Sequence, residues 1–342
     1  VDLDEPVTRF LPEFRLQGEG WQGVTARQLL SHTAGLPDID EAEYDEMVAH
    51  PELDARASAR FVRAFGFRTM LACPGERFAY SNLGYNALGL LITRATGLAF
   101  EDYMRAKVLN PSGMPDSTFF PHQVPPDRLV MPHLRTPHMT VNPILPYHRA
   151  DAPSSFLYAS LTEMCHWALT SLNRGSFEGQ RILSPASYDR MWTSVASRGV
   201  PPFREEMGLG WALGRFEGAR TVAHGGGGFG WTGHLILLPD ENRGAIILCN
   251  EESTAIEALE GAVMRAVLGR EPQAGPVSWM VPIAQALAAG GTQAASARIE
   301  NIINDQTYSF APYDLIPLVY QLRSAKQFDL AKEVLKLNLR AF

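Results

Sequence analysis

The chain has 342 residues, enough for one large domain with an appendage or for two domains. Its composition, 46% apolar, 10% aromatic and 20% charged, is that of an ordinary globular protein. The net charge of −7, the pI near 5.7 and the lack of a basic stripe argue against a nucleic-acid partner. No apolar run approaches the roughly 18 residues that a membrane-spanning helix needs, so we expect no membrane span.

Neither the cysteines nor the first residues indicate a compartment. Cys73, Cys165 and Cys249 lie far apart without metal-ligand spacing, and we interpret them as buried or incidental thiols. The sequence begins VDLDEPVTRFLPEF, with no initiator methionine and no signal peptide, and it reads as the middle of a domain. We therefore expect residues upstream of Val1, and targeting cannot be read from this chain.

The first 200 residues predict mainly helices joined by long loops. Thr25-Ala26-Arg27-Gln28 fits a capping box that begins a short helix. Residues 85–96 place apolar side chains at helical spacing and stop at Gly97, and a second helix follows from about 99 to 108. Two further helix starts are predicted, a capping box at Ser160-Leu161-Thr162-Glu163 and a Ser-Pro start at Ser184-Pro185.

Residues 121–153 are rich in proline and histidine and predict a long irregular loop, of the kind that often forms a lid. A metal site is the alternative interpretation of its histidines. Their spacings of 11, 5 and 10 residues fit no ligand pattern, and carboxylates are sparse nearby, so we expect no metal. We expect the loop to roof a cleft. The histidines are His122, His133, His138 and His148.

After about residue 205 the pattern changes to strands with short connections, which implies an antiparallel meander. An amphipathic helix over 254–268, ending at Gly269, is expected to cover it. The strands are expected at 209–216, 220–224, 231–238 and 244–250. Residues 275–342 predict helices near 278–289, 294–303, 314–324 and 327–339. Leu330, Val334 and Leu337 share one face of the last helix, which resembles the first part of a tetratricopeptide-type hairpin.

Tyr80-Ser81-Asn82 is the first segment that can carry chemistry, because it lies just before a predicted helix and after the turn at 73–76. A phenol can relay protons when a nearby cation lowers its pKa from about 10, and a carboxamide can hold a substrate amide. The alternative is structural: Tyr80 packs in the core and Asn82 caps the helix.

His224-Gly225-Gly226-Gly227 is the second such segment. Glycines at a strand edge let a ligand approach the backbone, and the N–H of Gly227 can form half of an oxyanion hole. His224 adds a hydrogen-bonding or cationic group. Two alternatives remain: a plain glycine-rich hairpin, and a dinucleotide fingerprint at Gly225-x-Gly227-x-x-Gly230. The fingerprint requires a helix to follow, whereas TGHLILLP predicts a strand.

Six segments in this order resemble the serine β-lactamase and penicillin-binding-protein superfamily over about residues 1–268, nearest its carboxypeptidase, esterase and β-lactamase branch with a Tyr-x-Asn motif. They are LDEPVTRFLPEF, VTARQLLSHTAGLPD, PGERFAYSNLGYNALGLLI, YASLTEMCHWA, GLGWALG and HGGGGFGWTGHLILLPDENRGAIILCN. The resemblance implies an α/β fold of the α+β type, an antiparallel sheet flanked by helices with a large helical subdomain, N-terminally incomplete. We expect a hydrolase domain at 1–270 and a helical appendage at 275–342, with the helical part of the former at about 15–204 and the sheet part at about 205–270.

By the same resemblance, Tyr80 is the tyrosine of the proton relay, Asn82 is the asparagine of the second motif, and Ser81 lies between them at the substrate. His224 stands where many members have lysine, Gly225 and Gly226 line the substrate, and Gly227 completes the oxyanion hole. The implied mechanism is acyl transfer through an acyl-serine, without metal or organic cofactor. Histidine for lysine favours esters or small peptides over penicillins, and 152–155 (Ala-Pro-Ser-Ser) replaces a glycine pair.

The nucleophile motif Ser-x-x-Lys is absent from these residues. The residues three positions before Lys107, Lys326, Lys332 and Lys336 are Met104, Arg323, Asp329 and Glu333. Ser31 is an alternative nucleophile, but we expect it to end a helix.

We therefore expect a serine hydrolase for an ester, amide or β-lactam whose 342-residue chain is inactive alone; the alternative is a non-catalytic binding or sensing module on the same fold. Self-association or pairing with a missing N-terminal segment would cover exposed strand edges, and the resemblance favours an extracytoplasmic location.

Overall fold

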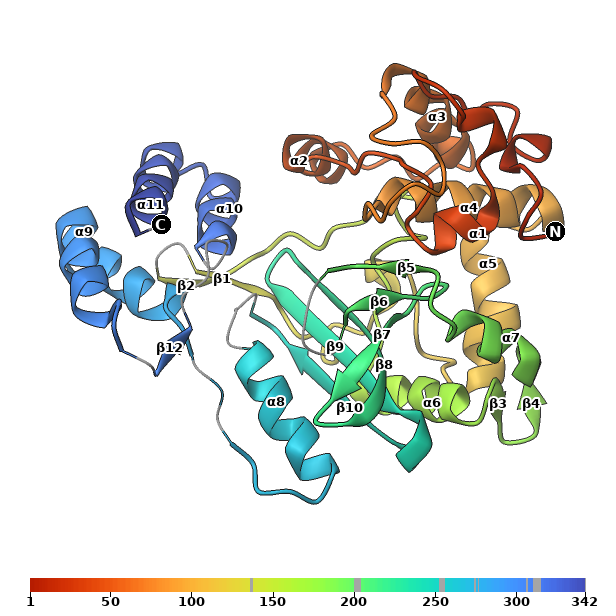
Figure 1. Cartoon of the computed structure of the whole chain (residues 1–342). Coiled ribbons are helices and arrows are strands. Elements are labelled where there is room, and N and C mark those ends of the chain that lie inside the picture. The colour runs from red at the N-terminus through yellow and green to blue at the C-terminus, as the bar shows by residue number, and fades with distance from the viewer. Residues whose placement is uncertain are drawn as a thin grey trace. The chain divides into compact units, whose positions relative to one another are not determined.

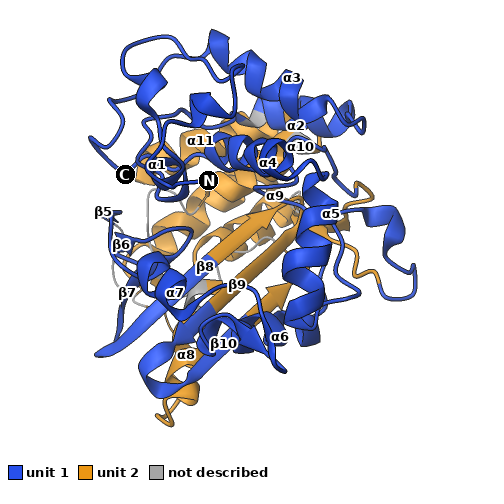
Figure 2. Cartoon of the chain, turned by 90° about the vertical axis from the view of Figure 1, so that its right-hand side faces the viewer, with its two compact units in different colours: residues 1–128, 145–224, 236–246 blue, residues 129–144, 225–235, 247–342 orange. Residues whose placement is uncertain are grey.

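The computed structural model describes residues 1–135, 138–199, 204–251, 256–273, 275, 277–305, 307–309 and 315–341. Helices and an antiparallel sheet make up the fold, as predicted (Figure 1). The chain divides into two compact units (Figure 2). Unit 1 comprises residues 1–128, 145–224 and 236–246, and unit 2 comprises 129–144, 225–235 and 247–342. The division at 270 and 275 stays a prediction.

The helices of unit 1 begin and end largely where local signals place them. Thr25 and Gln28 form the predicted reciprocal capping box, and α4 ends at Gly97 with φ of 74°. A π-helical turn at Arg105–Leu109 follows α5. The helices are α1 (Ala26–Leu30), α2 (Glu41–Ala49), α3 (Ala57–Ala64), α4 (Asn82–Thr96), α5 (Phe100–Met104), α6 (Leu161–Leu172) and α7 (Pro185–Met191).

The capping box predicted at Ser160 is only half formed. The Ser160 hydroxyl accepts the N–H of Glu163. The Glu163 carboxylate instead accepts the N–H of Asp116 at 2.9 Å and the hydroxyl of Ser117, at the other end of a long connection. The reciprocal half of the prediction is therefore wrong, because a tertiary partner competes for the carboxylate.

Helix α4 lies in the core of unit 1 and contacts α1, α3 and α5. Its buried residues Leu83, Ala87 and Leu90 belong to one apolar cluster with residues from the first 36 positions. Gly89 is required by a close approach, since a Cβ there would lie 2.0 Å from the Pro153 ring. The segment 152–155 is thereby packed against α4.

The six-stranded sheet has the order β10-β9-β8-β7-β6-β5, so the predicted meander is confirmed. Its strands are β5 (Ala196–Ser197), β6 (Glu206–Met207), β7 (Ala212–Phe216), β8 (Ala219–Gly228), β9 (Trp231–Leu238) and β10 (Arg243–Cys249). Strands β8, β9 and β10 each contribute residues to both units. β8 continues four residues beyond the predicted end at 224, so the four glycines are part of the strand.

Residues 121–153 are not wholly irregular. They contain an antiparallel pair, β1 (His133–Arg135) and β2 (Met139–Val141). The His133 N–H also donates to the carbonyls of Asn250 at 2.9 Å and Gly230 at 3.3 Å. These two carbonyls lie about a hundred residues away in the chain, so no local pattern indicates the bonds that His133 makes to them. Further short pairs join β3 (Ser176–Phe177) with β4 (Gln180–Arg181) and β11 (Val277–Ser278) with β12 (Tyr308–Ser309).

The helices of unit 2 are α8 (Ile256–Val267), α9 (Met280–Ile302), α10 (Ile316–Ser324) and α11 (Phe328–Ala341). The first two residues of the helix predicted at 254–268, and the first of that at 314–324, lie outside the described residues. α9 leaves helical geometry at Gly290 and Gly291, which divides it as the two predicted helices. Val334 and Leu337 are buried, so the apolar face of α11 is confirmed.

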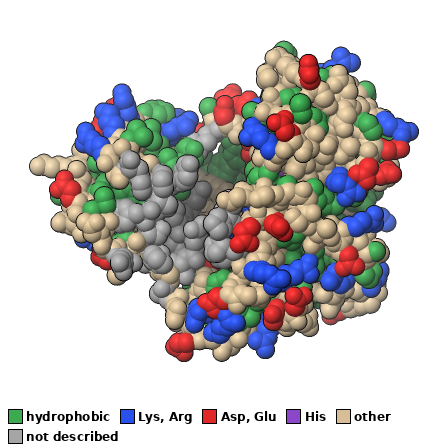
Figure 3. Space-filling model, viewed as in Figure 1, with side chains coloured by type: hydrophobic (Ala, Val, Ile, Leu, Met, Phe, Trp, Pro, Cys, Tyr) green, Lys and Arg blue, Asp and Glu red, His purple; other side chains and the backbone are tan. Residues whose placement is uncertain are grey.

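The described helices include none that is long and apolar enough to cross a bilayer. On the face shown in Figure 3, basic and acidic side chains are interspersed rather than gathered by sign. Cys73 and Cys165 are exposed and Cys249 is half-buried. Of the two interpretations, buried or incidental thiols, burial therefore does not apply to the first two.

Candidate active site

The Tyr80-Ser81-Asn82 segment is held in place by its middle residue. The Ser81 N–H donates to Nδ1 of His32 at 3.1 Å, and the Ser81 hydroxyl donates to the Pro37 carbonyl at 2.6 Å. Ser81 is buried. These bonds fix the backbone on either side and leave its predicted substrate contact as a prediction.

Asp38 fixes Asn82. One carboxylate oxygen of Asp38 accepts the Asn82 backbone N–H at 2.7 Å, and the other accepts Nδ2 of Asn82 at 3.1 Å. Asp38 therefore caps the first turn of α4 from 44 residues away. The alternative in which the Asn82 side chain caps the helix is therefore wrong, because Asp38 provides the cap and Asn82 is the first residue of α4. Sequence reasoning missed Asp38, whose one local signal was its place after Leu36-Pro37.

Tyr80 is 43% exposed, and its hydroxyl lies 3.5 Å from Oδ1 of Asn82, the amide atom that Asp38 leaves turned toward it. Its ring stacks on the His32 imidazole, with centroids 4.2 Å apart and planes 29° apart. Burial of the hydroxyl region, and next the negative charge of Asp38, raise the pKa of Tyr80, while Arg198 opposes the rise. Tyr80 is therefore a neutral phenol at neutral pH.

His32 is 2% exposed and has a left-handed backbone, with φ of 54°. Burial, and next the positive charges of His224 and Arg198, lower the pKa of His32 to about 3. Because Nδ1 accepts the Ser81 N–H, the single proton of the neutral ring is on Nε2. His32 is thus a neutral platform for Tyr80, and sequence reasoning assigned it no role.

His224 lies on the exposed side of β8 and its charge acts on His32. The structure therefore brings Tyr80, Asn82 and His224 of unit 1 to the surroundings of one imidazole. Gly225, Gly226 and Gly227 follow on β8 but belong to unit 2, where Gly226 and Gly227 are exposed. The oxyanion role of Gly227 stays a prediction.

The dinucleotide alternative is excluded by the strand that comes after the glycines. β8 turns at Phe229 and Gly230, which have φ of 57° and 94°, and continues directly into strand β9. A phosphate-binding fingerprint would need a helix N-terminus at this point.

Comparison with known proteins identifies the family. Residues 1–268 match the family described as Beta-lactamase. The chain belongs to this family. It is 24% identical over 260 residues to protein flp of Staphylococcus aureus strain MW2, covering 76% of this chain and 50% of the relative. It is 26% identical over 281 residues to a penicillin-binding protein of Bacillus subtilis strain 168, covering 78% and 58%. The chain thus spans about half the length of these curated relatives.

The fold is also that of solved members. The octameric penicillin-binding protein homologue from Pyrococcus abyssi superposes with a TM-score of 0.67 at 24% identity, covering 85% of this chain and 65% of that one. At this identity the likeness shows the fold alone. It confirms the predicted β-lactamase-like arrangement of helices and antiparallel sheet.

In this member of the β-lactamase family, Ser31 has the structural role expected of it. It is the C-terminal cap of α1, fully buried, and its hydroxyl donates to the Arg27 carbonyl at 2.9 Å. A second buried polar group, Asp151, directly precedes the segment 152–155. Asp151 accepts Nδ2 of Asn86 at 2.6 Å and the Ser154 hydroxyl at 3.0 Å. Burial raises the pKa of Asp151, whose charge in turn helps to raise that of Tyr80.

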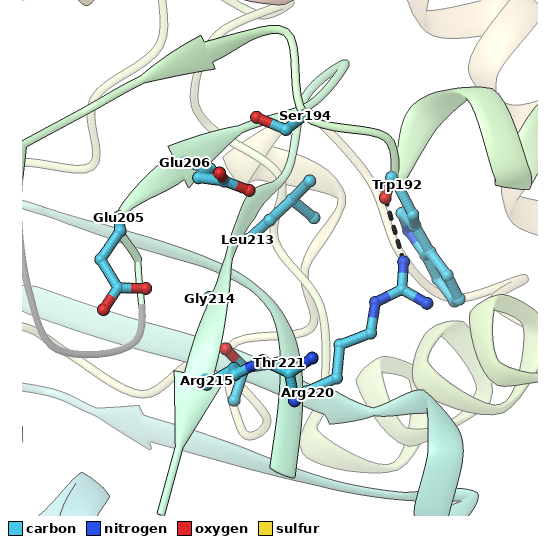
Figure 4. Close-up of a pocket in the computed structure, with 9 residues that line it drawn as sticks. All are labelled: Trp192, Ser194, Glu205, Glu206, Leu213, Gly214, Arg215, Arg220 and Thr221. Atoms are coloured by element: carbon cyan, nitrogen blue, oxygen red, sulfur yellow. Dashed lines mark hydrogen bonds between the residues drawn. The ribbon is translucent and has the colours of Figure 1, made fainter. Parts of the chain in front are cut away.

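The β-lactamase-family sheet also carries a cavity of about 280 Å³ on β6, β7 and β8 (Figure 4). Nη2 of Arg220 points across it to the Trp192 carbonyl at 3.0 Å. No predicted site residue lines it.

Of the four loop histidines, His133 lies on β1 and His148 is buried. Within the ranges that the structure describes, no three His, Cys, Asp or Glu side chains are grouped as metal ligands would be.

Proposed function

We propose that this chain supplies the proton-relay and substrate-binding side of an acyl-transfer hydrolase site for an ester or amide. One observation carries the proposal: Tyr80, stacked on neutral His32, presents its hydroxyl 3.5 Å from Asn82 Oδ1 with His224 and Arg198 acting on the same imidazole. Membership of the β-lactamase family supports it.

The chemistry requires a group that moves one proton. In acyl transfer a serine attacks the carbonyl carbon, the acyl–oxygen or acyl–nitrogen bond breaks, and water later releases the acyl group. A neutral phenol donates a proton to the leaving group, and a nearby cation lets the phenolate take a proton. We assign Tyr80 this relay, Asn82 the substrate carboxamide contact, His224 a polar contact and the Gly227 N–H the oxyanion contact.

The nucleophile is not among the residues assigned, since no Ser-x-x-Lys occurs in the 342 residues. We propose that the chain alone does not form an acyl-enzyme. Histidine at 224 in place of lysine supports esters or small peptides over penicillins as substrates.

The test is intact-mass spectrometry after treatment with a fluorophosphonate, with hydrolysis of p-nitrophenyl butyrate followed in parallel. It compares the 342-residue chain with the full product of its gene. We expect one serine adduct and hydrolysis in the full product, and Tyr80→Phe lowers its kcat by about 100- to 10,000-fold. No adduct and no hydrolysis in the full product, with saturable ligand binding, would establish the non-catalytic binding module instead.

A further inference from the structure

A buried histidine–glutamate pair connects helix α8 to the sheet within unit 2. His234 on β9 is 9% exposed, Glu260 on α8 is fully buried, and Nδ1 of the imidazole lies 3.2 Å from Oε1 of the carboxylate. In either charge state of the ring Nδ1 can hold a proton, so it donates to the carboxylate in both. Strand β9 is the neighbour of β8, which carries the four glycines.

The His234 ring fills the space that a side chain at position 225 would occupy. A Cβ on Gly225 would lie 3.1 Å from Nε2, 3.2 Å from Cδ2 and 3.4 Å from Cε1 of His234. A Cβ on Gly226, by contrast, would meet open space. An aromatic side chain on a neighbouring strand can supply the packing that a glycine in a sheet lacks. The tip of the imidazole therefore supports the β8 backbone at residue 225.

Stability alone does not explain a carboxylate at position 260. Ile256 and Met264, one helical turn to either side on α8, are buried and apolar, so Glu260 interrupts an apolar face. A buried ion pair costs desolvation, and apolar residues of similar volume are often equally or more stabilising. What the carboxylate adds is direction, because its bond to Nδ1 keeps the opposite edge of the ring turned toward Gly225. Neither His234 nor Glu260 is among the predicted site residues.

We propose that His234, oriented by Glu260, is a positioning residue of the acyl-transfer site. It fixes the β8 backbone at Gly225, two residues before Gly227, whose N–H we assign to the oxyanion contact. The inference rests on the proposed function and deepens it by naming what holds this donor. Four consecutive glycines have no side chains with which to fix their own strand. An oxyanion donor is effective only when it is held in place before the reaction, and the imidazole provides this support from the neighbouring strand.

The test compares kcat and KM for p-nitrophenyl butyrate in the full gene product. His234→Leu combined with Glu260→Leu replaces the pair by apolar atoms, so we expect a folded protein with a melting temperature no lower than that of the wild type. Removal of one oxyanion donor lowers kcat by about 100- to 1,000-fold, and a donor that is only displaced loses part of this, so we expect kcat to fall by about 10- to 100-fold. KM changes by less than about 3-fold, because the contact strengthens in the transition state.

Two single substitutions separate the two edges of the ring. His234→Asn places an amide near the position of Nδ1 and keeps a donor for Glu260, but it lacks the atoms that reach Gly225. His234→Gln is one carbon longer and reaches the position of Nε2. We expect His234→Gln to retain most of kcat and His234→Asn to lose about 10-fold or more. This comparison decides the inference even if the leucine variant does not fold.

The matched control replaces another buried carboxylate together with its hydroxyl partner. Glu163 is 7% exposed and accepts the Ser117 hydroxyl, and neither residue belongs to the candidate site. Glu163→Leu with Ser117→Ala is expected to lower the melting temperature and leave kcat unchanged.

Three outcomes would overturn the inference. A folded leucine variant with wild-type kcat shows that the pair is structural only, and equal kcat for His234→Asn and His234→Gln shows that the contact with Gly225 has no effect. Hydrolysis by the wild type in either case leaves the proposed function intact. A wild-type full gene product that does not hydrolyse the ester refutes the proposed function itself, and the positioning role with it.

Discussion

The pH dependence of stability can be predicted from His32, because its ring is buried and its Nδ1 accepts the Ser81 N–H. His32→Asn removes the imidazole while keeping two features of the site. Asparagine adopts the left-handed backbone more readily than most residues, which the φ of 54° requires. Its side-chain carbonyl also offers an acceptor in place of Nδ1 to the buried Ser81 N–H. The substitution therefore isolates the titration of the ring.

The direction of the effect depends on which state binds the extra proton. The pKa of His32 is lowered from 6.5 to about 3 in the folded chain. Between these values the unfolded chain is protonated and the folded chain is not, so stability is full above the unfolded value and is lost as the pH falls. One proton changes the free energy of unfolding by about 1.4 kcal/mol per pH unit. By about pH 4.5 the wild type has therefore lost about 2.7 kcal/mol through His32 relative to its stability well above the unfolded pKa.

The assay is urea unfolding of the wild type and of His32→Asn at several values between pH 7 and about pH 4.5. All other titrating groups are common to both proteins, so the difference in the free energy of unfolding reports His32. We expect that difference to shrink by about 2.7 kcal/mol over the window. His138→Asn, at an exposed position, is the control and keeps a constant difference. A difference for His32→Asn that is equally constant refutes the neutral, buried imidazole.

Two further outcomes test the packing and the assembly. Gly89→Ala places a Cβ 2.0 Å from the Pro153 ring and is expected to lower the free energy of unfolding by about 1–3 kcal/mol. Gly66→Ala is the control, since a Cβ at Gly66 meets open space and changes the free energy of unfolding little. A melting temperature that drops no further for Gly89→Ala than for Gly66→Ala contradicts the contact. β10 is an end strand of the sheet and Leu248 on it is 46% exposed, so we expect self-association, and a monodisperse monomer in sedimentation velocity is evidence against it.

Local chemistry made much of the fold predictable. The capping box at Thr25 and the end of α4 at Gly97 depend on groups within one helical turn, so short sequence patterns contain them in full. The meander was equally predictable, because consecutive strands joined by short turns have few other ways to pair. Tyr80 and His224 were chosen from motifs, and their common neighbour His32 was present in the LLSHTAGLPD segment without a pattern to mark it.

No local pattern indicates the contacts between residues that lie far apart in the sequence and meet only in the tertiary fold. Asp38 caps α4 across 44 residues, so the predicted start of that helix at residue 85 was three residues late. The Glu163 carboxylate accepts the Ser117 hydroxyl instead of the N–H at the start of its own helix, and the His133 N–H of β1 donates to the Asn250 carbonyl. In each case a side chain or strand with an adequate local explanation has a remote partner. Arg198 belongs to the same class, since nothing around it in sequence indicates Phe78 or Tyr80.

The cations near His32 favour its neutral form, and the neutral ring in turn allows these cations to lie close to it. A protonated imidazole between His224 and Arg198 would face repulsion from both, and burial would remove the water that could compensate it. A neutral ring has no such cost, and it lets a guanidinium approach the Tyr80 phenol across Phe78. Burial, and next the charge of Asp38, raise the pKa of Tyr80, and Asp151 adds to the rise while Arg198 opposes it. The phenol therefore keeps its proton at neutral pH, and the nearby cation favours its release when a substrate is present, as a proton relay requires.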